Sequence, residues 1–223
     1  MDKKHRIFIA INLPEDIKKT LTDEQKKWQE LFTPYQTESS GAGPARWVNS
    51  ENIHITLVFL GHLDDEELVE VCKITKEVAS RNSPFQVVLN KICYGPPRPH
   101  TKREQLVIDE QVGEASSRYG VGARMVWALG EKSQEFAALR DDLEKSLVQS
   151  GAVSFSPENR AFSPHVTLAR INQWEWRKIE PEERPEIEEE INLQFLVNSI
   201  ELMESKLKRG GAEYTILQSY KLQ

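Results

Sequence analysis

The sequence predicts an α+β protein whose strands pair mainly in antiparallel fashion. Segments typical of strands alternate with segments that carry the apolar spacing of helices, and the last third of the chain is rich in strand patterns. This order favours α+β architecture over a doubly wound parallel sheet. The chain also contains no glycine-rich phosphate loop of the P-loop or dinucleotide-binding type, so those nucleotide-binding folds are not expected.

The chain is expected to open with a buried strand followed by a helix. Residues 7–13 predict the strand, because apolar side chains dominate this run. Pro14 and the two acidic residues after it suit the first turn of a helix, since proline lacks an N–H and acids interact favourably with the helix dipole. Apolar residues then recur at roughly helical spacing as far as Phe32.

Two strands are expected next, at residues 46–48 and 54–60, after a loop rich in Ser, Gly and Pro. Gly61 is expected to end the second strand, because glycine often interrupts strands. His62 would then lie in a turn.

A second helix is predicted after this turn, because Asp64 and Glu67 have the spacing of a capping box. Residues 85–92 and 124–129 predict further strands. Between them lies a polar stretch with a candidate strand at residues 106–108.

The third helix is expected to start near Ser133 and to end at Gly151, which suits a C-terminal cap. Residues 165–171 predict a strand, and the acidic segment 174–190 is interpreted as a solvated loop. Two long strand-like runs, residues 193–207 and 214–222, are expected to form a final hairpin around adjacent glycines, with a break in these long runs as the alternative.

The composition predicts one soluble domain. The chain has 223 residues, enough for one substantial core, and no apolar run approaches the roughly 20 residues that cross a bilayer. Cys72 and Cys93 lack metal-binding spacing and indicate a reducing compartment. We therefore expect a single domain over residues 1–223, cytoplasmic, monomeric and without membrane association. The net charge of −6 is concentrated in the acidic segment, so it does not exclude a nucleic-acid substrate.

A short motif occurs twice, in two predicted strands far apart in the chain. His54-Ile-Thr56 and His165-Val-Thr167 share the pattern His, β-branched apolar residue, Thr, and each is followed by Leu. Because side chains alternate across a strand, each copy presents an imidazole and a hydroxyl on one face. One copy alone is most simply a strand residue with a satisfied hydrogen bond. Two matched copies are difficult to obtain by chance, so they indicate a functional pair.

The residue types favour acid–base hydrolysis of an activated phosphodiester. One neutral imidazole can take a proton from water while the other, protonated, gives one to a leaving alkoxide. The hydroxyls of Thr56 and Thr167 are good donors to phosphoryl oxygens but poor metal ligands. Metal sites need three or four ligands, and carboxylates or cysteines at ligand spacing are missing near either histidine in the sequence. We therefore expect neither a metal nor another cofactor.

The sequence resembles the 2H phosphoesterase superfamily, specifically the bacterial and archaeal RNA 2′,3′-cyclic phosphodiesterases, also called 2′-5′ RNA ligases. The resemblance covers most of the chain. It rests on the segments 6–11, 46–48, 54–61 and 162–170, and on Ser205, Gly211, Tyr214 and Thr215 near the C-terminus.

This resemblance implies two α+β lobes related by a pseudo-twofold axis, with helices outside and a cleft between them. It implies that His54 is the proton donor to the O3′ leaving group and that His165 is the proton acceptor that activates water. Thr56 and Thr167 are expected to bind the phosphate. The implied substrates are RNA with a 2′,3′-cyclic phosphate end or small cyclic nucleotides, and the implied product is a 2′-phosphate, with 2′-5′ ligation as a potential reverse reaction.

Two further site residues rest on the resemblance. Arg170 is expected to bind the phosphate, although it lies five residues after His165, an odd offset that needs a bulge or a long reach. Phe8 is a candidate for base stacking, with core packing as the alternative.

Residues 96–122 depart from the family pattern as an insertion of roughly twenty residues beyond a short connection. Its basic residues would either line one rim of an RNA-binding cleft or serve solubility. They are Arg98, His100, Lys102 and Arg103.

Two other functions remain open from the sequence. The protein would alternatively be a non-catalytic module that binds RNA ends, or an esterase for small cyclic or 2′-5′ linked nucleotides. Turnover of a cyclic phosphate separates the first alternative from the enzyme.

Overall fold

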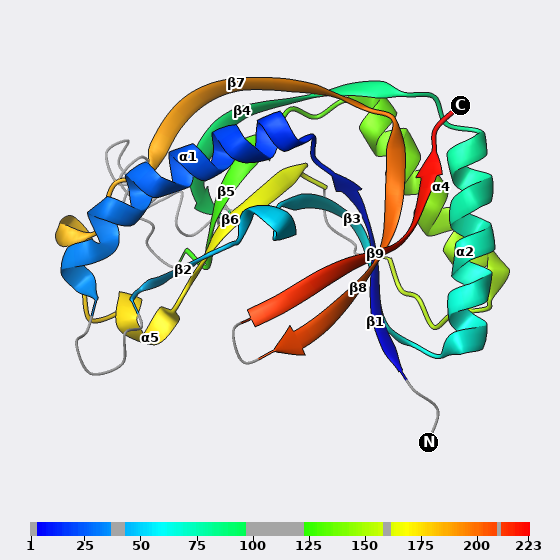
Figure 1. The fold of residues 1–223 in the computed structure, drawn as a ribbon, viewed down its shortest axis with the longest axis horizontal. Coiled ribbons are helices and arrows are strands. Elements are labelled where there is room, and N and C mark those ends of the chain that lie inside the picture. The colour runs from blue at the N-terminus through cyan, green and yellow to red at the C-terminus, as the bar shows by residue number, and fades with distance from the viewer. Residues whose placement is uncertain (1–3, 37–42, 97–122, 158–161, 209–210) are drawn as a thin grey trace, which may run out of the picture.

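The computed structural model describes residues 4–36, 43–96, 123–157, 162–208 and 211–223. The candidate strand at 106–108 and nearly all of the insertion 96–122 lie outside the described residues. Within the described ranges the chain forms a nine-stranded antiparallel sheet with helices packed on it (Figure 1).

The elements follow the predicted order. They are β1 (His5–Asn12), α1 (Glu15–Phe32), β2 (Ala45–Trp47), β3 (His54–Leu63), α2 (Asp65–Ser80), β4 (Phe85–Gly95), β5 (Met125–Gly130), α4 (Gln134–Ser150), β6 (His165–Ile171), α5 (Gln173–Trp176), β7 (Glu188–Val197), β8 (Ser199–Lys208) and β9 (Gly211–Lys221). Short 3₁₀ helices are η1 (Thr33–Tyr35), η2 (Ser50–Asn52) and η3 (Pro181–Glu183).

The sheet consists of two halves that meet at the two motif strands. The strand order is β7-β4-β5-β6-β3-β1-β8-β9, with β2 paired to β6. Each half therefore runs from a motif strand outward through three more strands, which confirms the predicted antiparallel α+β fold with two related lobes. The halves are joined where β3 and β6 pair antiparallel at Ile55 and Val166.

Helices cover the side of each half that faces away from the motif side chains. In Figure 1, α2 and α4 lie side by side against the half that contains β1, while α1 runs along the other half. The amide of Gln25 on α1 donates hydrogen bonds to the carbonyls of Val48 and Leu168, 3.0 and 2.7 Å away. The bond to Leu168 attaches α1 to the motif strand β6, and the bond to Val48 attaches it to the residue that follows β2.

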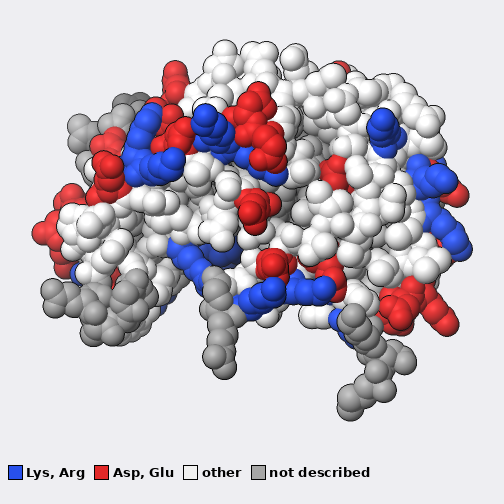
Figure 2. Space-filling view, in the orientation of Figure 1, with Lys and Arg blue, Asp and Glu red and all other residues white. Residues whose placement is uncertain are grey.

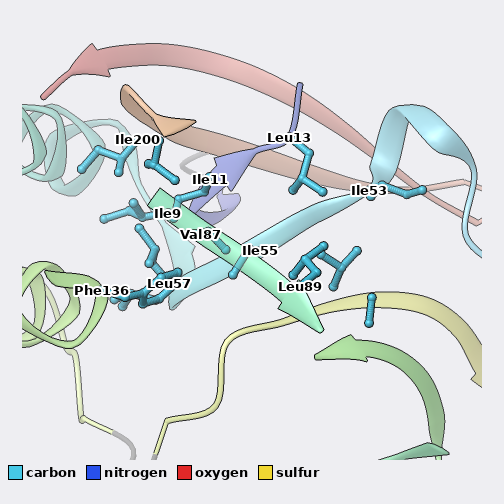
Figure 3. Packing of buried hydrophobic residues seen from close by; sticks show 14 of the residues in the cluster. Ile9, Ile11, Leu13, Ile53, Ile55, Leu57, Val87, Leu89, Phe136 and Ile200 are labelled. Carbon is cyan, nitrogen blue, oxygen red and sulfur yellow. The ribbon is translucent and has the colours of Figure 1, made fainter. Parts of the chain in front are cut away.

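The apolar positions of the motif lie in the main core, as the alternation predicts. Ile55, Leu57, Val166 and Leu168 are at most 3 % exposed. Figure 3 shows apolar side chains of β1, β3, β4 and α4 meeting in this core. Burial of apolar surface stabilises the fold by about 25 cal/mol per Å², so this packing holds in place the strands that carry the histidines.

The predicted helix ends are confirmed. The Asp64 carboxylate accepts a hydrogen bond from the Glu67 backbone N–H, and the Glu67 carboxylate accepts one from the Asp64 N–H, both at 2.9 Å. Ser133 caps α4 through Phe136 N–H at 3.0 Å. Gly151 has φ +61°, the left-handed conformation that favours glycine after a helix.

The prediction that Gly61 ends its strand was wrong. β3 continues to Leu63, and His62 pairs with Arg6 instead of lying in a turn. Gly61 has φ +82° next to a register shift where Leu60 is an extra residue on β3. Glycine adopts this conformation without a Cβ clash, so the strand bends at a bulge and goes on.

In the last third, the solvated-loop prediction was wrong, and the first of the two long runs does break. The acidic segment 174–190 is not one solvated loop, because Trp176 of α5 is 1 % exposed and stacks on Phe32 of α1 at 5.9 Å between ring centroids. The run 193–207 is not one strand. It breaks at Asn198 into β7, which joins the β4 half, and β8, which forms the expected hairpin with β9.

Candidate functional site

The two motif copies lie next to each other at the junction of the two halves. In the antiparallel register that pairs Ile55 with Val166, His54 lies across from Thr167, and Thr56 lies across from His165. Cβ atoms of directly opposite residues on an antiparallel pair are about 4.5–5.5 Å apart. Two imidazoles and two hydroxyls thus share one small patch. We call the surface on this side of the sheet the site face.

Equivalent backbone carbonyls orient the two imidazoles. Nδ1 of His54 donates to the carbonyl oxygen of Asn52 at 2.7 Å, and Nδ1 of His165 donates to that of Ser163 at 2.8 Å. A carbonyl can only accept, so each neutral ring carries its proton on Nδ1 and exposes a basic Nε2. Consistent with this tautomer, the Thr56 hydroxyl donates to Nε2 of His54 at 3.0 Å.

The surroundings of His54 are aromatic and buried. Its ring centroid lies 5.0 Å from that of Phe8 and 5.1 Å from that of Tyr214, and Phe8 and Tyr214 are 5.1 Å apart. Phe8, the predicted stacking residue, is 2 % exposed and lies in a small buried cluster with Ala10 and Met203. It therefore supports the His54 ring, and direct stacking of a base on it stays a prediction.

Burial lowers the pKa of His54 to about 4. Removal of the charged ring from water is the largest cause, and the positive charge of Arg170, with that of His165 when it is protonated, acts in the same direction. The hydrogen bond to Asn52 opposes this shift. His54 is therefore neutral at pH 7 while no anion occupies the site.

The surroundings of His165 differ. The indole of Trp127 stacks on this ring at 3.9 Å between centroids, with 26° between the planes. Trp127 is 6 % exposed and directly opposes Thr167 in the β5–β6 pairing. A planar surface therefore fixes the orientation of His165, whereas two tilted rings enclose His54.

Arg170 lies on the site face because β6 has a bulge. Trp127 pairs with Thr167 but Val126 pairs with Ala169, so Leu168 is an extra residue. This extra residue reverses the face on which later residues lie and returns Arg170 to the side of His165 and Thr167. Of the two alternatives for the odd offset, a bulge or a long reach, the structure has the bulge.

Arg46 on β2 pairs directly with Arg170 and adds a second guanidinium to this area. A Cβ on Gly211 would lie 2.5 Å from Nη2 of Arg46, and Gly211 has φ +131°. The positive φ therefore favours glycine here, and a Cβ would displace the end of the Arg46 side chain, which reaches from one half of the sheet to the start of β9. In Figure 2, Lys and Arg side chains lie across the middle of the molecule beside the β8–β9 hairpin.

The described residues hold no group of three His, Cys, Asp or Glu side chains that could bind a metal ion. Within the same ranges, no helix is both long and apolar enough to span a bilayer.

Comparison with known proteins places this site in a family. The sequence profile described as LigT like Phosphoesterase matches residues 11–103 and 129–214, which include both motif strands. The chain belongs to this family.

The curated relatives of this LigT-like phosphoesterase include proteins named RNA 2′,3′-cyclic phosphodiesterase. One from Thermus thermophilus is 26 % identical over 97 % of this chain and 90 % of the relative. One from Methanocaldococcus jannaschii is 26 % identical over 96 % of this chain and 99 % of the relative.

Solved structures share the fold of this LigT-like phosphoesterase. The protein TT0787 of Thermus thermophilus superposes with a TM-score of 0.70 at 24 % identity, covering 97 % of both chains. E. coli LigT in complex with 3′-AMP superposes with a TM-score of 0.66 at 21 % identity, covering 99 % of both chains.

Phe59 lies on the site face of this LigT-like phosphoesterase, and sequence reasoning did not name it as a candidate site residue. Register shifts leave Leu57 and Leu168 unpaired at equivalent points of β3 and β6. Phe59 thus occupies the twofold equivalent of Arg170. Its ring is 58 % exposed and lies 5.8 Å from that of Phe8. Alignment of the two motif copies would have found it, because Phe59 and Arg170 both follow the histidine by five residues.

Asn52 was also missed, since its role depends on a contact 160 residues along the chain. Its side-chain amide donates to the carbonyl oxygen of Ala212 at 2.8 Å, and its side-chain oxygen accepts from Tyr214 N–H at 3.3 Å. Asn52 thereby holds β9 against the start of β3, with Tyr214 beside His54.

Proposed function

We propose that this protein hydrolyses RNA 2′,3′-cyclic phosphate ends to 2′-phosphates without a metal, by acid–base catalysis with His54 and His165. The observation that carries the proposal is the antiparallel pairing of Ile55 with Val166, which sets the two His-x-Thr strands side by side. Membership of the LigT-like family and the names of the curated relatives support the choice of substrate.

The proposed reaction is an in-line displacement at phosphorus. Nε2 of His165 accepts a proton from water, and the water oxygen forms a bond to phosphorus. The bond from phosphorus to O3′ breaks, and Nε2–H of His54 gives its proton to that oxygen. His165 ends protonated and His54 neutral, and exchange with solvent resets both rings. Attack by an RNA 5′-hydroxyl in place of water would yield a 2′-5′ linkage, which stays a prediction.

The other site residues stabilise charge on the phosphate. The hydroxyls of Thr56 and Thr167 can donate to the non-bridging oxygens, and Arg170 can form charge-assisted bonds to them. A bound phosphate would also place negative charge beside His54, where Arg170 and His165 now lower its pKa. Substrate binding therefore favours the protonated His54 that the leaving group requires.

Phe59 offers the exposed aromatic surface for the terminal base. Stacking on an aromatic side chain contributes about 1–3 kcal/mol per base in single-strand recognition. Phe8 supports Phe59 from beneath, with its ring 5.8 Å away.

The test is a product assay on an oligoribonucleotide that ends in a 2′,3′-cyclic phosphate. We expect the wild type to form a 2′-phosphate in the presence of EDTA. His54→Ala and His165→Ala should each lose at least about 10³-fold in kcat, since each removes a proton-transfer group. His5→Asn is the matched control, because His5 bonds to Glu204 and Asp65 away from the site.

Near-wild-type turnover in both alanine variants would reject the proposal. Circular dichroism and thermal unfolding must show that each variant is folded. Binding of the RNA end without any turnover by the wild type would favour the non-catalytic alternative.

A further inference from the structure

Four residue pairs form a row along β1 and β3 on the site face. Asn12 pairs with His54, Ala10 with Thr56, Phe8 with Phe59, and Arg6 with His62. The even-numbered residues of β1 share one face, because β1 itself has no extra residue and the bulges lie on β3. The row thus leads from the catalytic histidine past the aromatic pair to an arginine and a histidine.

Arg6 and His62 are exposed, and neither forms an ion pair with an acidic side chain among the residues that the structure describes. Nη1 of Arg6 donates to the neutral hydroxyl of Ser205 at 3.3 Å. Across the part of the chain that the structure describes, no carboxylate lies within ion-pair distance of Arg6. The guanidinium is therefore available to a ligand.

Neighbouring cations contrast with Arg6, because carboxylates engage them. Lys206 pairs with Glu204 at 3.0 Å, and Lys208 pairs with Glu213. His5, the residue before Arg6, points to the other face and donates to the same Glu204 at 2.7 Å. Glu204 is thus occupied on the opposite side of the sheet. The chain has a net charge of −6, yet Arg6 has no acidic partner among the described residues. Its position on the site face therefore suits it to bind an anion.

Arg6 is placed to contact the RNA strand beside its reacting end, and not the reacting phosphate itself. With a rise of about 3.3 Å per residue, Arg6 lies about 7 Å beyond Phe8 along β1. A base stacked on Phe59 would place its own nucleotide between the histidine pair and Arg6. The next anionic group of an RNA is the phosphodiester that joins this nucleotide to the preceding one.

We propose that Arg6 and His62 form a second anion subsite, which binds the phosphodiester on the 5′ side of the terminal nucleotide. The Arg6 guanidinium supplies charge-assisted hydrogen bonds, and His62 supplies a ring N–H. This inference rests on the proposed function. It assigns the enzyme to RNA ends over free nucleoside cyclic phosphates, which have no such phosphodiester.

The test compares two substrates with the same terminal base. One is a dinucleotide with a 2′,3′-cyclic phosphate end, and the other is the corresponding nucleoside 2′,3′-cyclic phosphate. We expect the wild type to favour the dinucleotide in kcat/KM by about tenfold or more, as loss of one charge-assisted contact predicts. Arg6→Gln should reduce this ratio to near one, and Arg6→Lys should restore part of it.

Removing the charge of the internal phosphodiester is the change in the substrate that corresponds to removing the charge of Arg6. A dinucleotide with a methylphosphonate in place of the internal phosphodiester should lose the advantage with the wild type and show no further loss with Arg6→Gln. Lys19→Gln, on the exposed side of α1, controls for net charge and should keep the ratio.

Two results would overturn the subsite. These are a wild-type ratio of one, or an Arg6→Gln ratio equal to the wild-type ratio, which includes an equal fall of kcat/KM for both substrates. Failure of the proposed function is separate, because it would appear as no hydrolysis of either substrate by the wild type.

Discussion

The two motif strands have the same backbone but different neighbours. In β3 and β6 alike, a carbonyl two residues before the histidine orients its Nδ1, and a bulge follows the threonine. Around this common frame, His54 lies between Phe8 and Tyr214, whereas His165 stacks on Trp127. The twofold frame thus places two equal imidazoles side by side, and the neighbouring side chains give them different surroundings, which in the proposed reaction correspond to different roles.

The two halves differ most at the position five residues after each histidine. It is Phe59 in one half and Arg170 in the other, an exposed aromatic ring opposite a guanidinium. We infer that one half recognises the base and the other the phosphate. Each prediction below tests whether the halves are unequal in this way.

Among the changes that test this difference between the halves, Arg170→Ala is expected to have the largest effect. Loss of a charged donor to the transition-state phosphate should lower kcat by about 10²–10³-fold, comparable to removal of an oxyanion-hole donor. Single-turnover hydrolysis of an RNA cyclic phosphate measures it. The exchanged variant, Phe59→Arg with Arg170→Phe, keeps both side chains on opposite halves. Activity near wild type in the exchanged variant would show that the halves are interchangeable.

A smaller effect, mainly on binding, is expected for Phe59→Ala. Loss of one stacked base should raise KM about tenfold, within the range of 1–3 kcal/mol per base, and leave kcat less affected. Phe59→Tyr keeps the ring and should retain most affinity. A tenfold loss in kcat with constant KM would instead place Phe59 in the chemical step.

These two residues also show what sequence alone could predict. Alternation across a strand was enough to place His54 with Thr56 and His165 with Thr167 on one face. It could not show that Leu57 and Leu168 are extra residues, since a bulge follows from the partner strand's register and not from the local pattern. The odd offset of Arg170 therefore left two alternatives, a bulge or a long reach, and the sequence could not decide between them.

Contacts between segments far apart in the chain could not be predicted from the sequence, for a similar reason. Trp176 lies in a run of glutamates that predicts a solvated loop, yet it packs on Phe32, 144 positions earlier. Gly61 was expected to end a strand because its partner Ile7 was not known. Local patterns predicted which segments form strands and helices, while the long-range pairing decided where some of them end.

Stability should depend on pH through His54. The pKa is about 4 in the folded protein and about 6.5 in an unfolded chain, so the unfolded state binds the proton first as pH falls. The free energy of unfolding should therefore decrease as pH falls from 6.5 to 4. His54 contributes at most about 1.4 kcal/mol per pH unit to this decrease. Urea unfolding of wild type and His54→Gln measures it. Equal slopes in the two proteins would show that His54 has an ordinary pKa.

The smallest effect is expected for Asn52→Ala, which removes two bonds to β9 and keeps the backbone carbonyl that orients His54. Each lost hydrogen bond costs about 1 kcal/mol, so unfolding should become easier by about 1–2 kcal/mol. Looser packing of Tyr214 should also admit water to His54 and raise its pKa from about 4 toward its ordinary value. NMR titration of the His54 ring detects this change, and Gln218→Ala on the exposed part of β9 is the control. If Asn52→Ala is destabilised but the His54 titration is unchanged, Asn52 holds the hairpin without influencing the pKa of His54. The aromatic enclosure of His54 would then depend on Phe8 rather than on β9.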